Sequence, residues 1–431
     1  MKIGIDKIGF YTSNMYVDMT ELANARNEDP NKYLIGIGQE KMAVIPPTQD
    51  SVTLGANAAF KILTEEDKKA IDLVIFATES GIDNSKSGAV YVSRLLGLSP
   101  YLRAVELKQA CYGATAALQL AKGHVALNPD KKALVIGSDI ARYGLHTKGE
   151  PTQGGGACAM IVGQNPRILE LEETSACYME DVMDFWRPFN HTEALVNGKF
   201  SANIYVDFFK KVFSIYREKT GAKLEDFAAL LFHLPYTKQG LKGLRAAIEG
   251  ADPKISSELS RQFEFSRKYG RLVGNLYTGS LYLSLLSLLN NSDSLRANQR
   301  LGMFSYGSGA QGEFFTGRLV PGFEKMLDKT GYEEMLEKRE KISVSEYEKV
   351  FSSLEMRAEN LELNIDDDPA VFVFAGIEEY SYRLTTITTS LPWWLLQRRT
   401  IWHVMPQDGT DVHIALYIHS CATKHALLGT L

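Results

Sequence analysis

Short apolar runs without regular polar alternation recur along most of the chain. They are LVIFATES (73–80), ALVIGSD (133–139), CAMIVG (158–163), ALLFHLPY (229–236), LGMFSYGSG (301–309) and FFTGRLV (314–320). Runs of this length and composition are typical of strands that are covered on both faces of a sheet. Helical patterns lie between them, at ATAALQLAKGHVAL (114–127) and SLYLSLLSLL (280–289). Strands that alternate with helices predict an α/β fold with buried sheets.

The order of these elements is the same in two parts of the chain. A strand that ends near Glu79 precedes a helix that begins near Cys111, and a pair of strands follows. Later, a strand carrying His233 precedes a helix that begins near Asn275, and again a pair of strands follows. This repeat predicts two related halves whose four named residues meet at one central crevice.

The repeat places the first half at residues 1–166 and the second at residues 167–383. Two polar, amphipathic stretches near 178–222 and 323–365 lie outside the repeat, and we expect them to form helical caps on the core. The last segment, 384–431, holds three of the four Trp and four of the eight His and matches no periodic pattern. We expect this atypical tail to lie outside the fold.

Composition and charge narrow the class of function. Lys and Arg number 47 against 52 Asp and Glu, a net charge of −5, and a nucleic-acid-binding surface needs a basic excess instead. The N-terminus lacks the apolar segment of a signal peptide, and the apolar run 281–289 is too short to span a bilayer. The four cysteines have unrelated spacings, which favours neither a zinc site nor a disulfide framework. We therefore expect a cytoplasmic protein without a nucleic-acid or membrane partner.

Cys111 lies in ELKQACYGATAALQLA (106–121), at the predicted start of an apolar helix. The positive end of the helix dipole and the free backbone N–H groups favour a thiolate there, and hence a nucleophile. The alternative is a buried structural cysteine, the commoner fate of a free Cys, and this segment alone does not decide between the two. Cys158, Cys177 and Cys421 lack such a setting.

Three further polar signals are ambiguous when each is taken alone. Glu79 ends an apolar strand, where burial should raise its pKa towards the range of a general base, although it could simply cap the next helix. His233 lies in an apolar strand before Pro235, where a histidine is more often a satisfied core residue. Lys238 and Lys242 share one helical face that could meet a phosphate, but such pairs are usually solvated.

Two later segments suggest hydrogen-bond donors. Asn275 follows a glycine and precedes an apolar helix, so its side-chain amide could donate to a substrate carbonyl oxygen. Gly307, Ser308 and Gly309 form a flexible turn whose N–H groups could stabilise an oxyanion. The second signal is weak, because turns everywhere are built from Gly and Ser.

Taken together, these motifs resemble hydroxymethylglutaryl-CoA synthase in its bacterial form. The matching segments are DPNKYLIGIGQEKMAV, ATES, ACYGAT, ARYG with GEPTQGGGA, FHLPYTK, GNLYTGSLY and FSYGSG, which extend to about residue 383. The resemblance implies a thiolase-like fold, with duplicated βαβ halves in a five-layered αβαβα core and a helical cap, and a homodimer. It also implies an acyltransferase that condenses acetyl-CoA with acetoacetyl-CoA through an acetyl-Cys intermediate, early in the mevalonate pathway.

The resemblance also assigns roles to individual residues. It implies that Cys111 is the acetylated nucleophile, that Glu79 is the general base and acid, and that His233 polarises the acetoacetyl carbonyl with positive or donor character. Further positions implied to meet substrate are Asn275, Thr152, Ser201 and Ser308, with Tyr143 as a pocket wall and Lys238 and Lys242 on the CoA side. No metal or redox cofactor is implied, since acetyl-CoA and acetoacetyl-CoA are substrates.

Some residues depart from the family pattern, and rival interpretations stay open. Asn197, Phe189 and Lys148 differ from it, and we expect them to affect the substrate entrance more than the reaction. A polyketide β-branching relative would take one thioester from a carrier protein. Ketoacyl synthase III fits less well, because it lacks an acid placed like Glu79. A catalytically silent scaffold would not become acetylated by acetyl-CoA.

Overall fold

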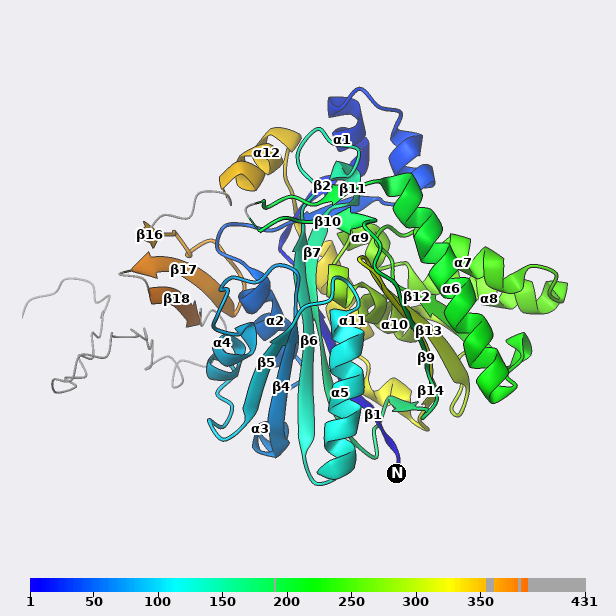
Figure 1. Cartoon of the computed structure of the whole chain (residues 1–431). Coiled ribbons are helices and arrows are strands. Elements are labelled where there is room, and N and C mark those ends of the chain that lie inside the picture. The colour runs from blue at the N-terminus through cyan, green and yellow to red at the C-terminus, as the bar shows by residue number, and fades with distance from the viewer. Residues whose placement is uncertain (190, 354–359, 379–380, 387–431) are drawn as a thin grey trace, which may run out of the picture.

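The structure is a computed structural model that describes residues 1–189, 191–353, 360–378 and 381–386. Its centre is a ten-stranded sheet in the order β12-β13-β14-β8-β1-β7-β6-β4-β5, with β9 paired to β14 (Figure 1). The strands are β1 (Ile3–Tyr11), β4 (Ile71–Ala77), β5 (Arg103–Leu107), β6 (Lys132–Ala141), β7 (Gly154–Gln164), β8 (Leu169–Leu171), β9 (Ala176–Met179), β12 (Phe227–Phe232), β13 (Arg300–Gly307) and β14 (Gln311–Leu319).

The predicted duplication is confirmed by the way these strands pair. In the first half β4 lies parallel to β6, β6 antiparallel to β7, and β7 antiparallel to β1. In the second half β12 lies parallel to β13, β13 antiparallel to β14, and β14 antiparallel to β8. The halves join where β1 and β8 pair, with Ile5 opposite Leu169. The same pattern therefore occurs twice and meets in the middle of the sheet.

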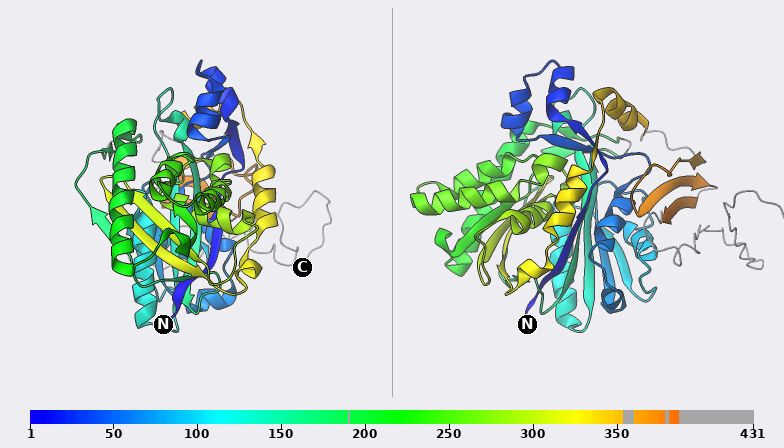
Figure 2. Two further views of the ribbon diagram at one scale, coloured as in Figure 1. Left: turned by 90° about the vertical axis from the view of Figure 1, so that its right-hand side faces the viewer. Right: turned by 180° about the vertical axis from the view of Figure 1, so that it is seen from behind.

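Helices and strands form the five layers expected of the thiolase-like fold. One hydrophobic core lies between the two halves, around α5 and α10. A second core packs α2 and α4 on the outer face of the first half, and a third packs α6, α7 and α8 on the outer face of the second (Figures 1 and 2). These helices are α2 (Ser51–Phe60), α4 (Gly88–Leu95), α5 (Gly113–Leu127), α6 (Gly198–Thr220), α7 (Gln239–Ile248), α8 (Pro253–Ser266) and α10 (Ser280–Asn291).

Strand β4 shows why the sequence folds this way. Val74 and Phe76 belong to the outer core, whereas Leu73, Ile75 and Ala77 belong to the central core. Both faces of the strand are covered from Leu73 onwards, so these positions are all apolar and the absence of polar alternation follows.

The remaining elements surround this core. They are α1 (Met19–Ala25), a π-helix (Lys32–Ile37), α3 (Glu65–Ala70), α9 (Gly270–Val273), α11 (Lys329–Glu337), α12 (Val344–Ser353), the sheet of β15 (Glu340–Lys341), β2 (Met15–Asp18) and β3 (Lys41–Val44), the hairpin of β10 (Phe185–Trp186) and β11 (Leu195–Val196), and the sheet of β16 (Leu361–Glu362), β17 (Phe372–Glu378) and β18 (Ser381–Thr386). The expected caps contain the β10–β11 hairpin and α6 in one case and α11 and α12 in the other, where 354–359 lie outside the described residues.

The C-terminal boundary expected at residue 383 falls inside a strand. β18 continues to Thr386 and pairs with β17, where Leu384 is buried opposite Phe374. Leu384 belongs to the same core as α2 and α4, so the fold extends at least to Thr386. The rest of the expected tail, with Cys421, lies outside the described residues.

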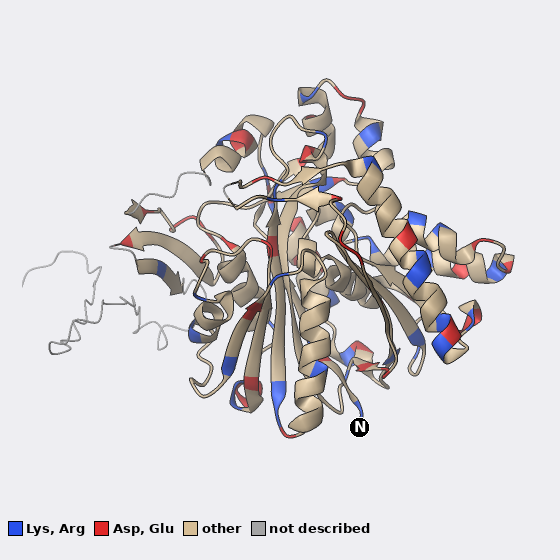
Figure 3. Cartoon of the chain, viewed as in Figure 1, with Lys and Arg blue, Asp and Glu red and all other residues tan. Residues whose placement is uncertain are grey.

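Charged side chains follow the layering. In Figure 3, Lys, Arg, Asp and Glu intermingle on the outer helices α6, α7 and α8, while the central strands carry few charges. Within the described part of the chain, no helix combines the length and apolarity needed to cross a membrane.

Candidate active site

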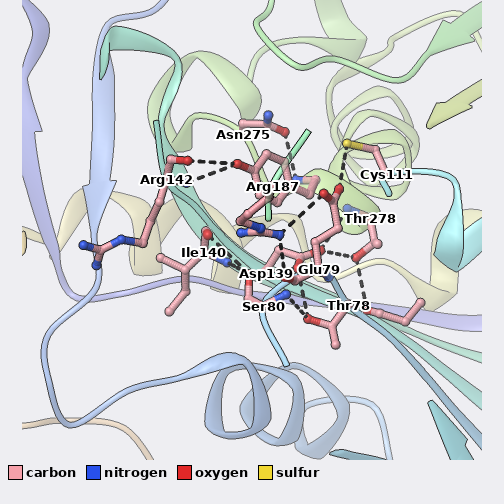
Figure 4. A network of polar contacts seen from close by, with 12 residues as sticks. Thr78, Glu79, Ser80, Cys111, Asp139, Ile140, Arg142, Arg187, Asn275 and Thr278 are labelled. Carbon is pink, nitrogen blue, oxygen red and sulfur yellow. Dashed lines mark hydrogen bonds and ion pairs between the residues drawn. The ribbon is translucent and has the colours of Figure 1, made fainter. Parts of the chain in front are cut away.

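Glu79 and Cys111 meet where β4 ends and α5 begins. Glu79 follows β4 by two residues, and Cys111 precedes the first residue of α5 by two. The Cys111 thiol donates a hydrogen bond to Glu79 Oε1 at 3.1 Å (Figure 4). A nucleophile and a base are therefore in direct contact, although 32 residues separate them in the sequence.

Asp139, near the end of β6, holds the Glu79 loop from below. Its Oδ1 accepts the backbone N–H of Glu79 at 2.6 Å and the hydroxyls of Thr78 and Ser80, both at 3.0 Å. Its Oδ2 accepts the backbone N–H and the hydroxyl of Thr278, at 3.0 and 2.5 Å. The buried carboxylate thus ties the Glu79 loop to the second half.

Arg187 lies on the other side of Glu79, in the loop after β10. Its Nη2 donates to the backbone carbonyl of Glu79 at 2.5 Å and lies 3.6 Å from Glu79 Oε2. Figure 4 shows the Glu79 carboxylate between Arg187 and the sulfur of Cys111. The side chains of Arg187 and Glu79 are 18% and 5% exposed, so this contact is shielded from water.

The surroundings raise the pKa values of both reacting groups. Burial, and next the charge of Asp139, raises the pKa of Glu79 to about 7, against the opposing effects of Arg187 and of the hydrogen bond from Cys111. The predicted rise for Glu79 is therefore confirmed. Burial, followed by the Glu79 carboxylate, also raises the pKa of Cys111 well above its usual value. The prediction of a ready thiolate is wrong for this state, because burial and the adjacent anion outweigh the helix N-terminus.

His233 follows β12, at the position that corresponds to the Glu79 loop. Its backbone N–H donates to Phe304 at 2.9 Å, and its carbonyl accepts the Tyr205 hydroxyl at 2.8 Å. The ring is buried, and Nδ1 has no hydrogen-bond partner among the described residues. Burial lowers the pKa of His233 to about 3. Of the two expected possibilities, a positive charge or a hydrogen-bond donor, the neutral ring corresponds to the donor.

Asn275 lies ahead of α10, five residues before its first residue, Ser280. Its Oδ1 accepts the backbone N–H of Tyr277 at 2.8 Å and the hydroxyl of Ser280 at 2.9 Å. These bonds fix the orientation of the amide. Its Nδ2 is buried and makes no hydrogen bond of good geometry within the described part of the chain, although the Asn275 side chain is close enough to Tyr143 to oppose the rise of that residue's pKa. An oriented N–H group without a partner is suited to binding a carbonyl oxygen.

Two glycines allow each half to approach the loop of the other. A Cβ on Gly307, at the end of β13, would lie 2.6 Å from the Gln109 carbonyl and 2.7 Å from the Tyr112 backbone nitrogen. A Cβ on Gly137, in β6, would lie 3.2 Å from the backbone of both Thr278 and Gly279. The start of α5 thus packs on the second half, and the start of α10 packs on the first.

The other predicted substrate-contacting residues differ in their surroundings. The half-buried Tyr143 packs edge-on against Tyr277, with ring centroids 6.0 Å apart, and burial and then the nearby Cys111 raise its pKa. The Thr152 hydroxyl donates to the Gly149 carbonyl at 2.7 Å, and the Ser201 hydroxyl donates to Asp184 at 2.9 Å.

The turn of Gly307, Ser308 and Gly309 is less free than predicted. Gly307 pairs with Gln311 in the sheet, and the N–H of Gly309 donates to Asp184 Oδ1 at 2.9 Å. One of the N–H groups of the turn that could stabilise an oxyanion is therefore already bonded within the protein. The Asp184 carboxylate competes for it from the loop that carries Arg187.

Lys238 and Lys242 lie at the start of α7 and on its first turn. Lys238 Nζ donates to the Ile35 carbonyl at 3.0 Å, and Lys242 Nζ lies 3.3 Å from the Tyr236 hydroxyl. Both hydrogen bonds are at the surface, so both cations remain accessible to a phosphorylated ligand.

The residues that depart from the family pattern also lie at the surface. Asn197 caps the start of α6 through a bond from the Phe200 N–H at 3.2 Å. Phe189 is 93% exposed, and Lys148 is exposed as well. Cys158 is buried in β7, as its apolar surroundings predict.

A cavity of about 1190 Å³ opens beside Glu79. It is lined by Glu79, Ser80, Arg142 and Arg187 together with the loop 81–87 and residues of the C-terminal sheet. Cys111 and His233 are not among the residues that line it, whereas Glu79 lines it and also contacts the Cys111 thiol. No cluster of three or more His, Cys, Asp or Glu side chains in the described ranges could hold a metal ion.

Several residues of the site were missed from the sequence. Asp139 ends an apolar run in the same way as Glu79, and this signal could have identified it. Thr278, Asp184 and Arg187 lie in segments without a distinguishing pattern, and only the fold brings them to Glu79.

Comparison with known proteins places this geometry in a family. Residues 1–167 match the family described as hydroxymethylglutaryl-coenzyme A synthase N terminal, and residues 169–249 and 245–370 match its C-terminal counterpart. The hydroxymethylglutaryl-CoA synthase of Enterococcus faecalis is 52% identical over 85% of this chain and 94% of its own length. A polyketide-biosynthesis 3-hydroxy-3-methylglutaryl-ACP synthase of Bacillus subtilis is 32% identical over 85% and 93%. A crystal structure of an HMG-CoA synthase complexed with CoA superposes with a TM-score of 0.87, at 44% identity, over 90% of this chain and 100% of that one.

Proposed function

The chain belongs to the hydroxymethylglutaryl-CoA synthase family, and on this premise we propose how Cys111, Glu79, His233 and Asn275 divide the steps of its reaction. The protein is an acyltransferase that condenses acetyl-CoA with acetoacetyl-CoA to 3-hydroxy-3-methylglutaryl-CoA and CoA, an early step of the mevalonate pathway. One water molecule is consumed, because the acyl group leaves the enzyme by hydrolysis.

The first step transfers the acetyl group to sulfur. Cys111 attacks the thioester carbonyl of acetyl-CoA, and Glu79 accepts the thiol proton through the 3.1 Å contact that already joins the two groups. CoA leaves as its thiol after taking up a proton. The raised pKa of Cys111 makes this proton acceptor useful, since only the thiolate is a strong nucleophile.

The second step forms the carbon–carbon bond. Glu79, ionised again, removes a proton from the methyl group of acetyl-Cys111, and the resulting enolate attacks C3 of acetoacetyl-CoA. In this proposal His233 and Asn275 donate hydrogen bonds to the carbonyl oxygen that becomes an alkoxide. The alkoxide takes up a proton, water hydrolyses the thioester on Cys111, and the product leaves bound to CoA.

The proposal is supported by the different kinds of group that the two halves contribute. A thiol–carboxylate pair comes from the first half, and two buried nitrogens without partners, His233 Nδ1 and Asn275 Nδ2, come from the second. A purely structural histidine and asparagine would normally have these nitrogens bonded.

We also propose that two copies of the chain form a homodimer. Strand β5 lies at the edge of the ten-stranded sheet, and its Val105 is 43% exposed. Tyr101, two residues before β5, is 91% exposed. Phe189 is 93% exposed, and its ring lies 5.5 Å from Nζ of Lys108, the residue after β5. An open edge with exposed aromatics favours pairing with a partner. Sedimentation velocity should give a dimer, and Val105→Lys should shift it towards the monomer.

A cytoplasmic location is proposed for the same enzyme. The reaction needs Cys111 as a reduced thiol, and the reducing cytoplasm maintains thiols. Acetyl-CoA and acetoacetyl-CoA are the small-molecule partners that the proposed steps require.

The experiment separates the two steps with Cys111→Ala and Glu79→Ala. Cys111→Ala should form no acetyl-enzyme in intact-mass spectrometry. Glu79→Ala loses a proton acceptor but also the anion that opposes the Cys111 thiolate, so it should still become acetylated. Its condensation rate should fall by about 10²–10⁴, the usual effect of losing a general base.

Circular dichroism on both variants checks that they fold. If Glu79→Ala condenses near the wild-type rate, or loses acetylation as completely as Cys111→Ala, the division of roles between these residues is wrong.

A further inference from the structure

Arg187 directly follows β10, and the segment before β10 is held to the second half. Three residues before it, Asp184 accepts hydrogen bonds from the Ser201 hydroxyl at 2.9 Å, the Tyr306 hydroxyl at 2.7 Å and the Gly309 N–H at 2.9 Å. Asp184 therefore anchors the loop to the second half. Arg187 reaches in the opposite direction, to Glu79 of the first half.

We propose that Arg187 is a positioning residue for the condensation, which keeps Glu79 ionised and directed at Cys111. This inference rests on the proposed role of Glu79 as the general base. It adds a function for the loop between β10 and β11, which the motifs of the sequence did not indicate.

The geometry gives Arg187 two holds on the same residue. Its guanidinium contacts the backbone carbonyl and faces the carboxylate of Glu79, while Asp139 holds the backbone N–H from below. The Glu79 backbone is therefore held from two directions: the Arg187 guanidinium binds its carbonyl and the Asp139 carboxylate binds its N–H group. The Arg187 guanidinium also lies 5.8 Å above the Tyr277 ring, which restricts where it can move.

The charges around Glu79 show why a cation is needed. Asp139 disfavours the ionised form of Glu79, as burial does, and the Cys111 hydrogen bond and Arg187 favour it. Tyr143 and Tyr277, which also face the carboxylate, have raised pKa values, chiefly through burial, and stay neutral. Arg187 is the basic residue that forms an ion pair with Glu79 among the described residues. Without it, the site would hold two carboxylates and a thiol, and Glu79 would retain its proton to higher pH.

The test measures the condensation rate of acetylated enzyme against pH in Arg187→Gln, Arg187→Lys and a matched control. In the wild type the rate should rise with pH as Glu79 ionises. In Arg187→Gln this acid limb should move up by about 1 pH unit, so that the rate at pH 6 falls about tenfold and the two curves converge above pH 9. Arg187→Lys keeps the charge, so its acid limb should lie close to that of the wild type. Lys199→Gln removes a cation from the exposed start of α6 and should follow the wild-type curve.

The outcomes separate this inference from the proposed function. A uniform loss at every pH in Arg187→Gln, or no change, would overturn the role of Arg187. If Glu79→Gln retains both its condensation rate and the acid limb, the role of Glu79 itself is wrong. If circular dichroism shows that Arg187→Gln does not fold, Arg187→Lys decides instead. The Lys ammonium is a point charge without the forked guanidinium, so the acid limb should lie between that of the wild type and 1 pH unit higher. A limb in Arg187→Lys that matches the wild type while the rate falls equally at all pH values would then count against the inference.

Discussion

The loops after β4 and β12 occupy corresponding places in the two halves, but they carry opposite chemistry. The first half brings a carboxylate against a thiol, with a second carboxylate, Asp139, beneath them. The second half brings a neutral imidazole and an oriented amide, each with one nitrogen that has no partner among the described residues. Burial raises the pKa of Glu79 and lowers the pKa of His233.

This difference indicates how one duplicated scaffold serves a reaction between two similar substrates. Acceptors of protons are needed where a nucleophile forms, and neutral donors are needed where an oxyanion forms. The backbone also corresponds: Ala110 and Tyr277, each three residues before the first residue of α5 or α10, have φ values of 44° and 40°. The topology therefore fixes the positions of these residues, and the side chains determine which half supplies the proton acceptors and which supplies the hydrogen-bond donors.

The largest expected effect comes from removing the donors of the second half. His233→Ala and Asn275→Ala should each lower the condensation rate by about 10²–10³, the usual loss for one oxyanion donor. Acetylation of Cys111 should persist, because the thiol–carboxylate pair is untouched. Mass spectrometry of the acetyl adduct beside a condensation assay checks both. Loss of acetylation in either folded variant would mean that the second half also serves the first step.

A steric change tests how closely the halves depend on each other. Gly307→Ala forces a Cβ to within 2.7 Å of the Tyr112 backbone, so it should destabilise the fold by about 1–3 kcal/mol. Gly137→Ala meets its neighbours at 3.0 Å or more and should destabilise less. Chemical denaturation of both variants measures the difference. Equal stabilities for the two would show that the start of α5 can move away from β13.

The two halves should also respond oppositely to pH. His233 has a folded pKa of about 3 against about 6.5 when unfolded, so only the unfolded chain gains its proton between these values. Its contribution makes the fold less stable as pH falls below 6.5, by about 1 kcal/mol per unit. Glu79 has a folded pKa of about 7, above its unfolded value, so its contribution is lost as pH rises towards 7.

Denaturation of two variants at several pH values isolates these contributions. His233→Gln should reduce the loss of stability in acid, and Glu79→Gln should reduce the loss between pH 5 and 7. Identical pH dependence in wild type and His233→Gln would contradict a neutral buried ring.

The smallest effect is expected at the surface of the second half. Lys238→Ala combined with Lys242→Ala should raise the Michaelis constants for the CoA substrates severalfold and change turnover little, because such contacts bind ground and transition states alike. Steady-state kinetics with both substrates measures this, and the single exposed change Lys199→Gln serves as the control. Unchanged Michaelis constants would place CoA elsewhere.

The sequence predicted the fold and the central pair well, because both depend on local pattern. Apolar runs and their repeated order indicated the duplicated halves, and Glu79 was recognisable as an acid that ends such a run. The charge state of Cys111 was predicted wrongly, since a helix start is visible in the sequence and the burial and facing carboxylate are not. Arg187 could not be predicted, because its segment becomes meaningful only when the loop after β10 is folded over Glu79.

The close packing at Gly137 and Gly307 has a consequence for the history of the chain. Each half offers a bare stretch of backbone on which the other half rests its reactive loop. Two independent domains can diverge in sequence without affecting each other. Here a larger residue at Gly137 or Gly307 would displace the reactive loop of the other half. Once the copies had exchanged support in this way, neither could be lost, separated onto its own chain or remodelled without a matching change in the other.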